Sequence, residues 1–182
     1  MLELSSNTIK VLGIFGRLSP EIEVWLDELE NQYSQKPKGD QYSIFRHLTL
    51  TFETEASPSD LKQQLELLRD LRKFLPLRIK PKKAFVKDEE SMSGAEHVAL
   101  EFDLSETKDL VDYVRARCGE SAVATWYIKL VWFVPVEHQA VVMSRLSELQ
   151  ELEFTDFYLC ANKQDDANTL FTSRGFDAAA EN

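Results

Sequence analysis

Apolar and polar residues alternate in several stretches of the chain, a period-two pattern that is typical of strands with one buried face. The clearest stretch is 125–134. Its apolar side consists of Trp126, Ile128, Leu130, Trp132 and Val134. In all, we expect strands near 8–15, 44–52, 77–86, 97–103, 125–134 and 154–161.

The stretch 44–52 alternates in the same way, and because successive strand residues point to opposite faces its two sides can be assigned. The apolar side is expected to hold Ile44, Leu48, Leu50 and Phe52. The other side is expected to hold Phe45, His47, Thr49 and Thr51. Arg46 is the exception, since a charged residue falls on the apolar side.

Between these strands the apolar residues recur at three- and four-residue spacing, which predicts amphipathic helices. Ser19-Pro20 and Ser57-Pro58 each combine an N-cap serine with a proline in the first turn, so helices are expected to begin there. Gly119 is expected to end a third helix. The expected helices cover roughly 20–33, 58–75, 105–118 and 136–152.

The resulting order is strand, helix, strand, helix, strand, strand, helix, strand, helix, strand. Helices with one apolar stripe need a sheet to cover, and strands with one apolar face leave the other face exposed. The sequence therefore predicts an α+β fold. We expect one domain over 1–174, whose halves 8–87 and 97–161 share an element order, and a flexible tail at 175–182.

Charge limits the kinds of partner that the protein can bind. The 182 residues include 21 Lys and Arg against 31 Asp and Glu, a net charge of -10. Because nucleic acids are bound through clustered positive charge, an extended nucleic-acid footprint is not expected. Basic residues concentrate at 69–87, where eight of them oppose Asp70 alone, a balance of +7. This segment is either a solvated helix end and strand or a patch that faces phosphate.

The sequence also bears on location and cofactors. No window approaches the roughly 18 uninterrupted apolar residues of a membrane span, and the N-terminus lacks a signal-like pattern, so we expect a cytoplasmic protein without a membrane partner. Cys118 and Cys160 are expected to be reduced thiols, because two cysteines make neither a disulfide framework nor a zinc cluster. No glycine-rich phosphate loop or metal-ligand cluster occurs, so neither cofactor nor metal is expected.

The first residues that could perform chemistry are His47-Leu48-Thr49-Leu50. Residues two apart on a strand share a face, which places the imidazole and the hydroxyl side by side, roughly 6 to 7 Å apart along the chain. An imidazole can act as general acid or base near neutral pH, and a threonine hydroxyl can bind a phosphate oxygen.

This His-x-Thr motif on the second strand, within the element order above, resembles the 2H phosphoesterase superfamily, also called the bacterial 2'-5' RNA ligase family. The resemblance covers about residues 8–161. It implies two pseudo-symmetric α+β lobes of mostly antiparallel sheet, with helices outside and a central cleft to which each lobe contributes one His-x-Thr. It further implies metal-independent acid–base chemistry on 2',3'-cyclic or 2'-5' phosphodiesters.

The second motif departs from the family pattern. The matching strand reads Tyr127-Ile128-Lys129-Leu130, so a tyrosine stands at the histidine position and a lysine at the threonine position. A phenol with a pKa of about 10 is a poor base at neutral pH, whereas an ammonium is a good partner for phosphate. The pair therefore preserves anion binding better than acid–base catalysis. Tyr127 and Lys129 as ordinary exposed strand residues remain the alternative.

The other histidines have weaker claims to function. His97 shares the polar side of its strand with Ala99, and we interpret it as a structural or rim residue, with rescue of the missing second histidine as the alternative. His138 lies early in the fourth expected helix and is interpreted as a solvated surface residue.

Three hypotheses follow. In the first, the chain is a 2H phosphoesterase that acts on a short phosphodiester or RNA end in a locally positive cleft formed with Arg46. His47 serves as general acid or base, Thr49 binds a phosphate oxygen, and Tyr127 and Lys129 anchor the phosphate. In the second, the chain is a noncatalytic nucleotide- or RNA-end-binding module. In the third, it is a protein-interaction domain that uses its acidic helices. The sequence leaves open the direction of the reaction, hydrolysis or ligation, and the oligomeric state.

Overall fold

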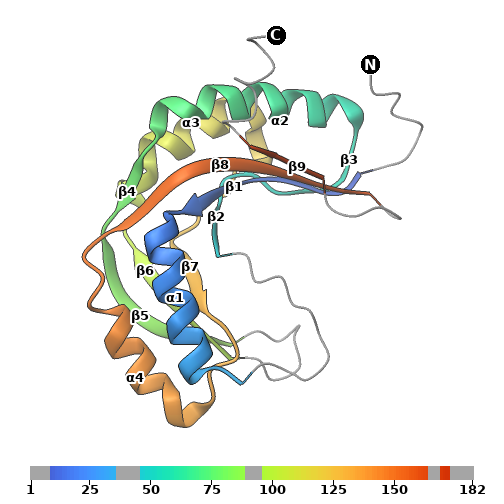
Figure 1. The fold of residues 1–182 in the computed structure, drawn as a ribbon. Coiled ribbons are helices and arrows are strands. Elements are labelled where there is room, and N and C mark those ends of the chain that lie inside the picture. Colours follow the sequence, from blue (N-terminus) through green and yellow to red (C-terminus); the bar gives the residue numbers. More distant parts are fainter. Residues whose placement is uncertain (1–8, 36–45, 89–95, 164–168, 173–182) are drawn as a thin grey trace.

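The computed structural model describes residues 9–35, 46–88, 96–163 and 169–172, and its strands follow a strongly curved, C-shaped arrangement (Figure 1). The strands are β1 (Ile9–Leu18), β2 (His47–Thr49), β3 (Glu53–Ala56), β4 (Leu77–Ile79), β5 (Pro81–Asp88), β6 (Glu96–Phe102), β7 (Tyr127–Val131), β8 (Leu152–Lys163) and β9 (Thr169–Thr172). The α-helices are α1 (Pro20–Tyr33), α2 (Pro58–Asp70), α3 (Lys108–Cys118) and α4 (Val136–Leu146).

The strands belong to two sheets. The larger has the order β2-β1-β8-β4, with β3 also paired to β1 and β9 to β8, and the smaller has the order β5-β6-β7. All these pairs are antiparallel. Helix α2 packs on β1 and β8, whereas α1 packs on β7 and α4 on β5 and β6. The expected α+β fold of two lobes with outer helices is confirmed, and α1 packs on the smaller sheet although it directly follows β1 of the larger one.

The expected strand at 77–86 is in fact two strands in different sheets. β4 pairs with β8 in the larger sheet, and β5 pairs with β6 in the smaller one. The chain passes from one lobe to the other at Lys80. The local sequence pattern indicates extended backbone, but it does not reveal which neighbouring strand each part will pair with.

The helix starts agree with the serine signals. The Ser19 hydroxyl accepts a hydrogen bond from the backbone of Ile22, and Ser57 and Asp60 form a reciprocal capping box. Gly119, with φ 55°, follows the end of α3. The fourth helix is shorter than expected, because α4 ends at Leu146 and the chain reaches the core again as β8.

The basic segment 69–87 forms ion pairs mainly on the exposed surface. Arg78 pairs with Glu153 at 2.9 Å, Lys82 with Asp103 at 3.0 Å and Lys83 with Glu101 at 3.2 Å. These pairs agree with the solvated-surface interpretation, since they neutralise the charge locally. Lys87 differs, because its ammonium lies 5.9 Å from the ring centre of Tyr127.

Some expectations concern the tail, the start of the second strand and membrane association. The expected tail at 175–182 lies outside the described residues, as do Ile44 and Phe45 of the expected strand 44–52. None of the helices in the described ranges has the length and apolar content that crossing a membrane requires.

Candidate functional site

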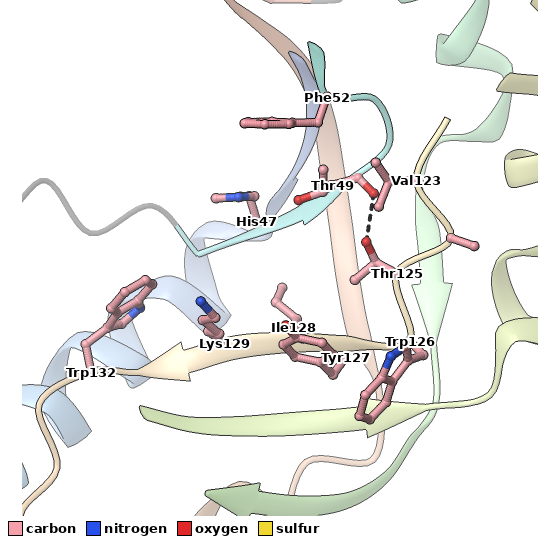
Figure 2. Close-up of a pocket in the computed structure, with 11 residues that line it drawn as sticks. His47, Thr49, Phe52, Val123, Thr125, Trp126, Tyr127, Ile128, Lys129 and Trp132 are labelled. Atoms are coloured by element: carbon pink, nitrogen blue, oxygen red, sulfur yellow. Dashed lines mark hydrogen bonds between the residues drawn. The ribbon is translucent and has the colours of Figure 1, made fainter. Parts of the chain in front are cut away.

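A cavity of about 490 Å³ opens between the two sheets, where the edge strands β2 and β7 face each other (Figure 2). His47 and Thr49 enter it from β2, and Tyr127 and Lys129 enter it from β7. The remaining lining residues are Phe52, Val123, Ala124, Thr125, Trp126, Ile128 and Trp132. The structure therefore brings all four residues singled out in the sequence to one pocket, although they come from distant parts of the chain.

Strand β2 presents His47 and Thr49 through the expected alternation. It pairs with β1 so that His47 lies opposite Arg17 and Thr49 opposite Phe15. Leu48 between them is 1% exposed and belongs to the core. The His47 ring contacts the Phe15 ring edge-on, with centroids 4.6 Å apart, so the imidazole has a fixed apolar neighbour on its own sheet face.

The alternation reverses directly after β2. The backbone N–H groups of Leu50 and Thr51 both donate to the carbonyl oxygen of Ile14, at 2.9 and 3.3 Å, which marks a β-bulge with one extra residue. Thr51 is consequently buried, and its hydroxyl accepts from the Ile14 N–H and donates to Gln64. Phe52 is 47% exposed and lines the pocket. The expected sides of Thr51 and Phe52 were both wrong, because a bulge is invisible to a period-two pattern.

A second irregularity lies in β7. Lys129 is opposite Ala99, whereas Val131 is opposite Val98, so Leu130 is the extra residue. Ile128 and Leu130 are buried as expected, but beyond the shift Trp132 turns to the pocket instead of continuing the apolar face. Each of the two site strands thus has a bulge that turns an aromatic side chain towards the pocket.

Trp126 was also expected on the apolar face, and it too lines the pocket. It precedes β7 and is 44% exposed. Its ring stacks on Phe85 of β5, with an interplanar angle of 11° and centroids 5.7 Å apart. The indole is therefore held by an aromatic neighbour and keeps a large surface accessible to a ligand.

The segment 121–125 joins the two lobes beside β2. The N–H of Val123 donates to the carbonyl oxygen of Leu50 at 2.9 Å, and the N–H of Phe52 donates to that of Ser121 at 3.0 Å. The hydroxyl of Thr125 donates to the carbonyl oxygen of Thr49 at 3.1 Å, the bond drawn in Figure 2. These bonds fix the end of β2 against the segment that leads into β7.

Lys129 supplies positive charge to the pocket wall. Burial, and secondarily the charge of Lys87, lower the pKa of its ammonium from the usual value. The ammonium lies 5.3 Å from the ring centre of Trp132, within the range of a cation–π contact. A bound anion would favour the charged form of Lys129, because an opposite charge offsets both burial and repulsion.

The remaining polar residues of interest lie outside the pocket. His97 is fully buried against Trp132, with centroids 4.1 Å apart, so it supports the pocket wall from behind and does not lie on an open face or rim. His138 is half-buried, and its Nδ1 hydrogen-bonds the carbonyl oxygen of Tyr33 at 3.0 Å, so the solvated-surface interpretation was wrong. Arg46 is buried towards α1 and adds no charge to the pocket.

Within the described part of the chain, no group of three or more His, Cys, Asp or Glu side chains is arranged to hold a metal ion. The polar groups that face the pocket are instead an imidazole, hydroxyls and an ammonium. Such groups suit an anionic ligand, since hydroxyls and ammonium donate hydrogen bonds to oxygen.

Comparison with known proteins gives structural matches only. No family model matches the chain, and neither does a curated protein. Kluyveromyces marxianus Usb1 with uridine monophosphate superposes with a TM-score of 0.56 at 12% identity, over 90% of this chain and 97% of that one. Escherichia coli LigT complexed with 3'-AMP superposes with a TM-score of 0.54 at 16% identity, over 92% and 95%. Both belong to the 2H phosphoesterase superfamily, so the resemblance expected from the sequence is confirmed for the fold.

Proposed function

Given the 2H phosphoesterase fold of this chain, we propose that the pocket between β2 and β7 binds a short phosphodiester of the nucleotide or RNA-end type. The observation that carries this proposal is the convergence of His47, Thr49, Tyr127 and Lys129 on one cavity. The nucleotides in the two similar structures, uridine monophosphate and 3'-AMP, support this class of ligand. Thr49, Tyr127 and Lys129 hold the phosphate by hydrogen bonds and charge.

The proposed reaction is hydrolysis of a 2',3'-cyclic or 2'-5' phosphodiester. The oxygen of a water molecule attacks phosphorus while the bond from phosphorus to one ribose oxygen breaks. His47 takes the proton from the water, and the ammonium of Lys129 protonates the leaving oxygen. An ammonium beside the bound phosphate carries a proton that the developing negative charge on the leaving oxygen can accept.

The aromatic residues of the pocket suit a base. Phe52 and Trp126 are both about half exposed on the cavity wall, and Phe85 holds the Trp126 indole in place. Flat aromatic faces bind bases by stacking with little preference for sequence. The base would therefore lie towards Phe52 and Trp126, with its phosphate towards His47 and Lys129.

The test is turnover of a panel that contains a 2',3'-cyclic nucleotide and a 2'-5'-linked dinucleotide. We expect slow hydrolysis, because one acid–base group contributes on the order of 10² to 10⁴ in rate and the second histidine is absent. His47→Ala should abolish it. His138→Gln, which changes a histidine of α4 outside the pocket, is the matched control and should keep full activity. Absence of turnover across the panel in the unaltered protein would rule out the catalytic proposal.

One observation favours a second candidate, a noncatalytic binding module. The lysine and tyrosine of β7 retain anion-binding groups at the place where the family carries its second histidine and threonine. Such a module would bind 3'-AMP saturably without product, and Lys129→Ala would weaken the binding. Binding that does not change with salt concentration would contradict an electrostatic phosphate contact.

A further inference from the structure

Arg46 contacts both halves of the site without entering the pocket. It directly precedes His47, and because successive residues of an extended chain point to opposite faces, its side chain leaves on the far side of the strand. Only 3% of that side chain is exposed. An arginine this deeply buried needs a partner for nearly every donor, since an unpaired buried charge is strongly destabilising.

The guanidinium finds these partners on β7 and α1. Nε donates to the carbonyl oxygen of Leu130 at 2.6 Å. Nη1 donates to Glu23 at 2.8 Å and to Asp27 at 2.7 Å, and Nη2 donates to Glu30. One planar group therefore bonds a strand of the smaller sheet and three carboxylates of the helix that covers it.

The contact with β7 falls at a structurally specific place. Leu130 is the extra residue of the β7 bulge and has no residue opposite it in β6. It directly follows Lys129, just as Arg46 directly precedes His47. Arg46 is thus the neighbour of His47, and Leu130 is the neighbour of Lys129. The bond between Arg46 and Leu130 therefore links the two strands next to the side chains that line the pocket.

We propose that Arg46 is a positioning residue that holds β2 against β7 and so sets the separation of His47 and Thr49 from Tyr127 and Lys129. This proposal rests on the proposed function, because the separation matters only to a ligand that bridges the two strands. A displacement of about 1 Å can reduce the rate of a well-oriented reaction on the order of 10²-fold. Lysine cannot replace Arg46, since its compact ammonium lacks the planar fork of donors that reaches two elements at once.

The first test is the affinity for 3'-AMP, measured by calorimetry at a temperature where all variants are folded. Arg46→Lys should weaken binding about tenfold. Val142→Ala, which removes methyl groups from the core side of α4 and leaves every Arg46 contact in place, is the control for lowered stability and should bind like the unaltered protein. Equal affinity of Arg46→Lys and the unaltered protein would overturn the proposal.

The second test separates positioning from general stability. In the unaltered protein, Thr49→Ala and Lys129→Ala should be non-additive in 3'-AMP affinity, because both residues hold one phosphate. In the Arg46→Lys background the two changes should become additive, since the strands no longer hold the phosphate together. If Arg46 had a purely structural role, Arg46→Lys would lower the folded fraction but the two substitutions would remain non-additive. Non-additivity in the Arg46→Lys background would therefore contradict the positioning role.

The third test does not depend on any ligand. Amide hydrogen exchange should increase in peptides covering 47–52 and 127–131 of Arg46→Lys and remain normal there in Val142→Ala. If Arg46→Lys does not fold, Glu23→Gln provides a milder test, because it removes one of the three carboxylates that fix the guanidinium and should raise exchange in the same two segments by a smaller amount. Unchanged exchange in both segments would refute the role of Arg46. Failure of the unaltered protein to bind 3'-AMP would refute only the proposed function.

Discussion

The hydroxyl of Thr125 donates a hydrogen bond to the backbone carbonyl oxygen of Thr49, 3.1 Å away, and links the strand that carries His47 to the chain entering β7. Thr49 belongs to the larger sheet, whereas Thr125 leads into the smaller one. The bond therefore crosses from one lobe to the other between two residues that line the pocket.

Removing this bond should weaken the junction between the lobes. Thr125→Val keeps the shape of the side chain but lacks the donor, and we expect a loss of about 1 kcal/mol in the free energy of unfolding. Urea denaturation measures this loss. Thr125→Ser retains the hydroxyl and is the control. Equal stability of the valine variant and the unaltered protein would show that water replaces the bond without cost.

Thr51 tests the reversal of sides at the β2 bulge. Its buried hydroxyl accepts from the Ile14 N–H and donates to Gln64, so Thr51→Val should cost roughly 1 to 3 kcal/mol of stability by leaving buried polar groups unpaired. The affinity for 3'-AMP should not change, because Thr51 does not line the pocket. If Thr51→Val lowers the affinity for 3'-AMP but not the stability, Thr51 contacts the ligand and its assignment to the buried side is wrong.

Because of Lys129, both the phosphate affinity and the stability of the protein should change with pH in the alkaline range. Burial lowers the pKa of the folded-state ammonium below that in the unfolded chain, so between the two pKa values the unfolded state binds more protons and stability rises with pH. Phosphate affinity should fall over the same range, because the ammonium loses its charge. Urea denaturation and phosphate titrations between pH 8 and 11 measure how stability and phosphate affinity change with pH. Both pH dependences should be smaller in Lys129→Met.

The control for this experiment is Lys83→Met, an exposed lysine of β5 that pairs with Glu101 away from the pocket. It should retain both pH slopes of the unaltered protein. If Lys129→Met and Lys83→Met behave alike, the effect comes from net charge and not from the pocket lysine.

Trp126 should distinguish a nucleotide from inorganic phosphate. Trp126→Ala removes an accessible ring that can stack a base, a contact that contributes about 1 to 3 kcal/mol. The affinity for 3'-AMP should fall accordingly, while the affinity for inorganic phosphate should be unchanged. Trp126→Phe, which keeps an aromatic face, should lose less. An equal loss for both ligands would indicate that the substitution distorts the phosphate site.

His97 should make the protein sensitive to mild acid. Burial lowers the pKa of its imidazole, so in the window between the folded value and the usual 6.5 the unfolded state binds more protons. Stability should therefore fall as the pH drops below about 6.5. His97→Gln cannot titrate and should show a smaller difference between pH 5 and pH 7.5 in urea denaturation. An unchanged difference would assign the acid sensitivity to other groups.

The sequence predicted helices well wherever local chemistry dictates their ends. Ser19 and Ser57 cap α1 and α2 as expected, because the serine hydroxyl and the first backbone N–H groups are neighbours in the chain. The fourth helix was expected to reach Leu152 and ends at Leu146. Leu152 is buried in the larger sheet, and tertiary burial, not helical spacing, decides its conformation.

The sequence by itself determined that His47 and Thr49 share a strand face, as do Tyr127 and Lys129, since a strand has a period of two. Only the tertiary structure decided that these two faces meet in one pocket, because the meeting depends on two edge strands from different sheets. It likewise decided the sides of Phe52 and Trp132. Each follows a bulge. A bulge arises from the register between two paired strands, and the sequence of one strand does not contain this register.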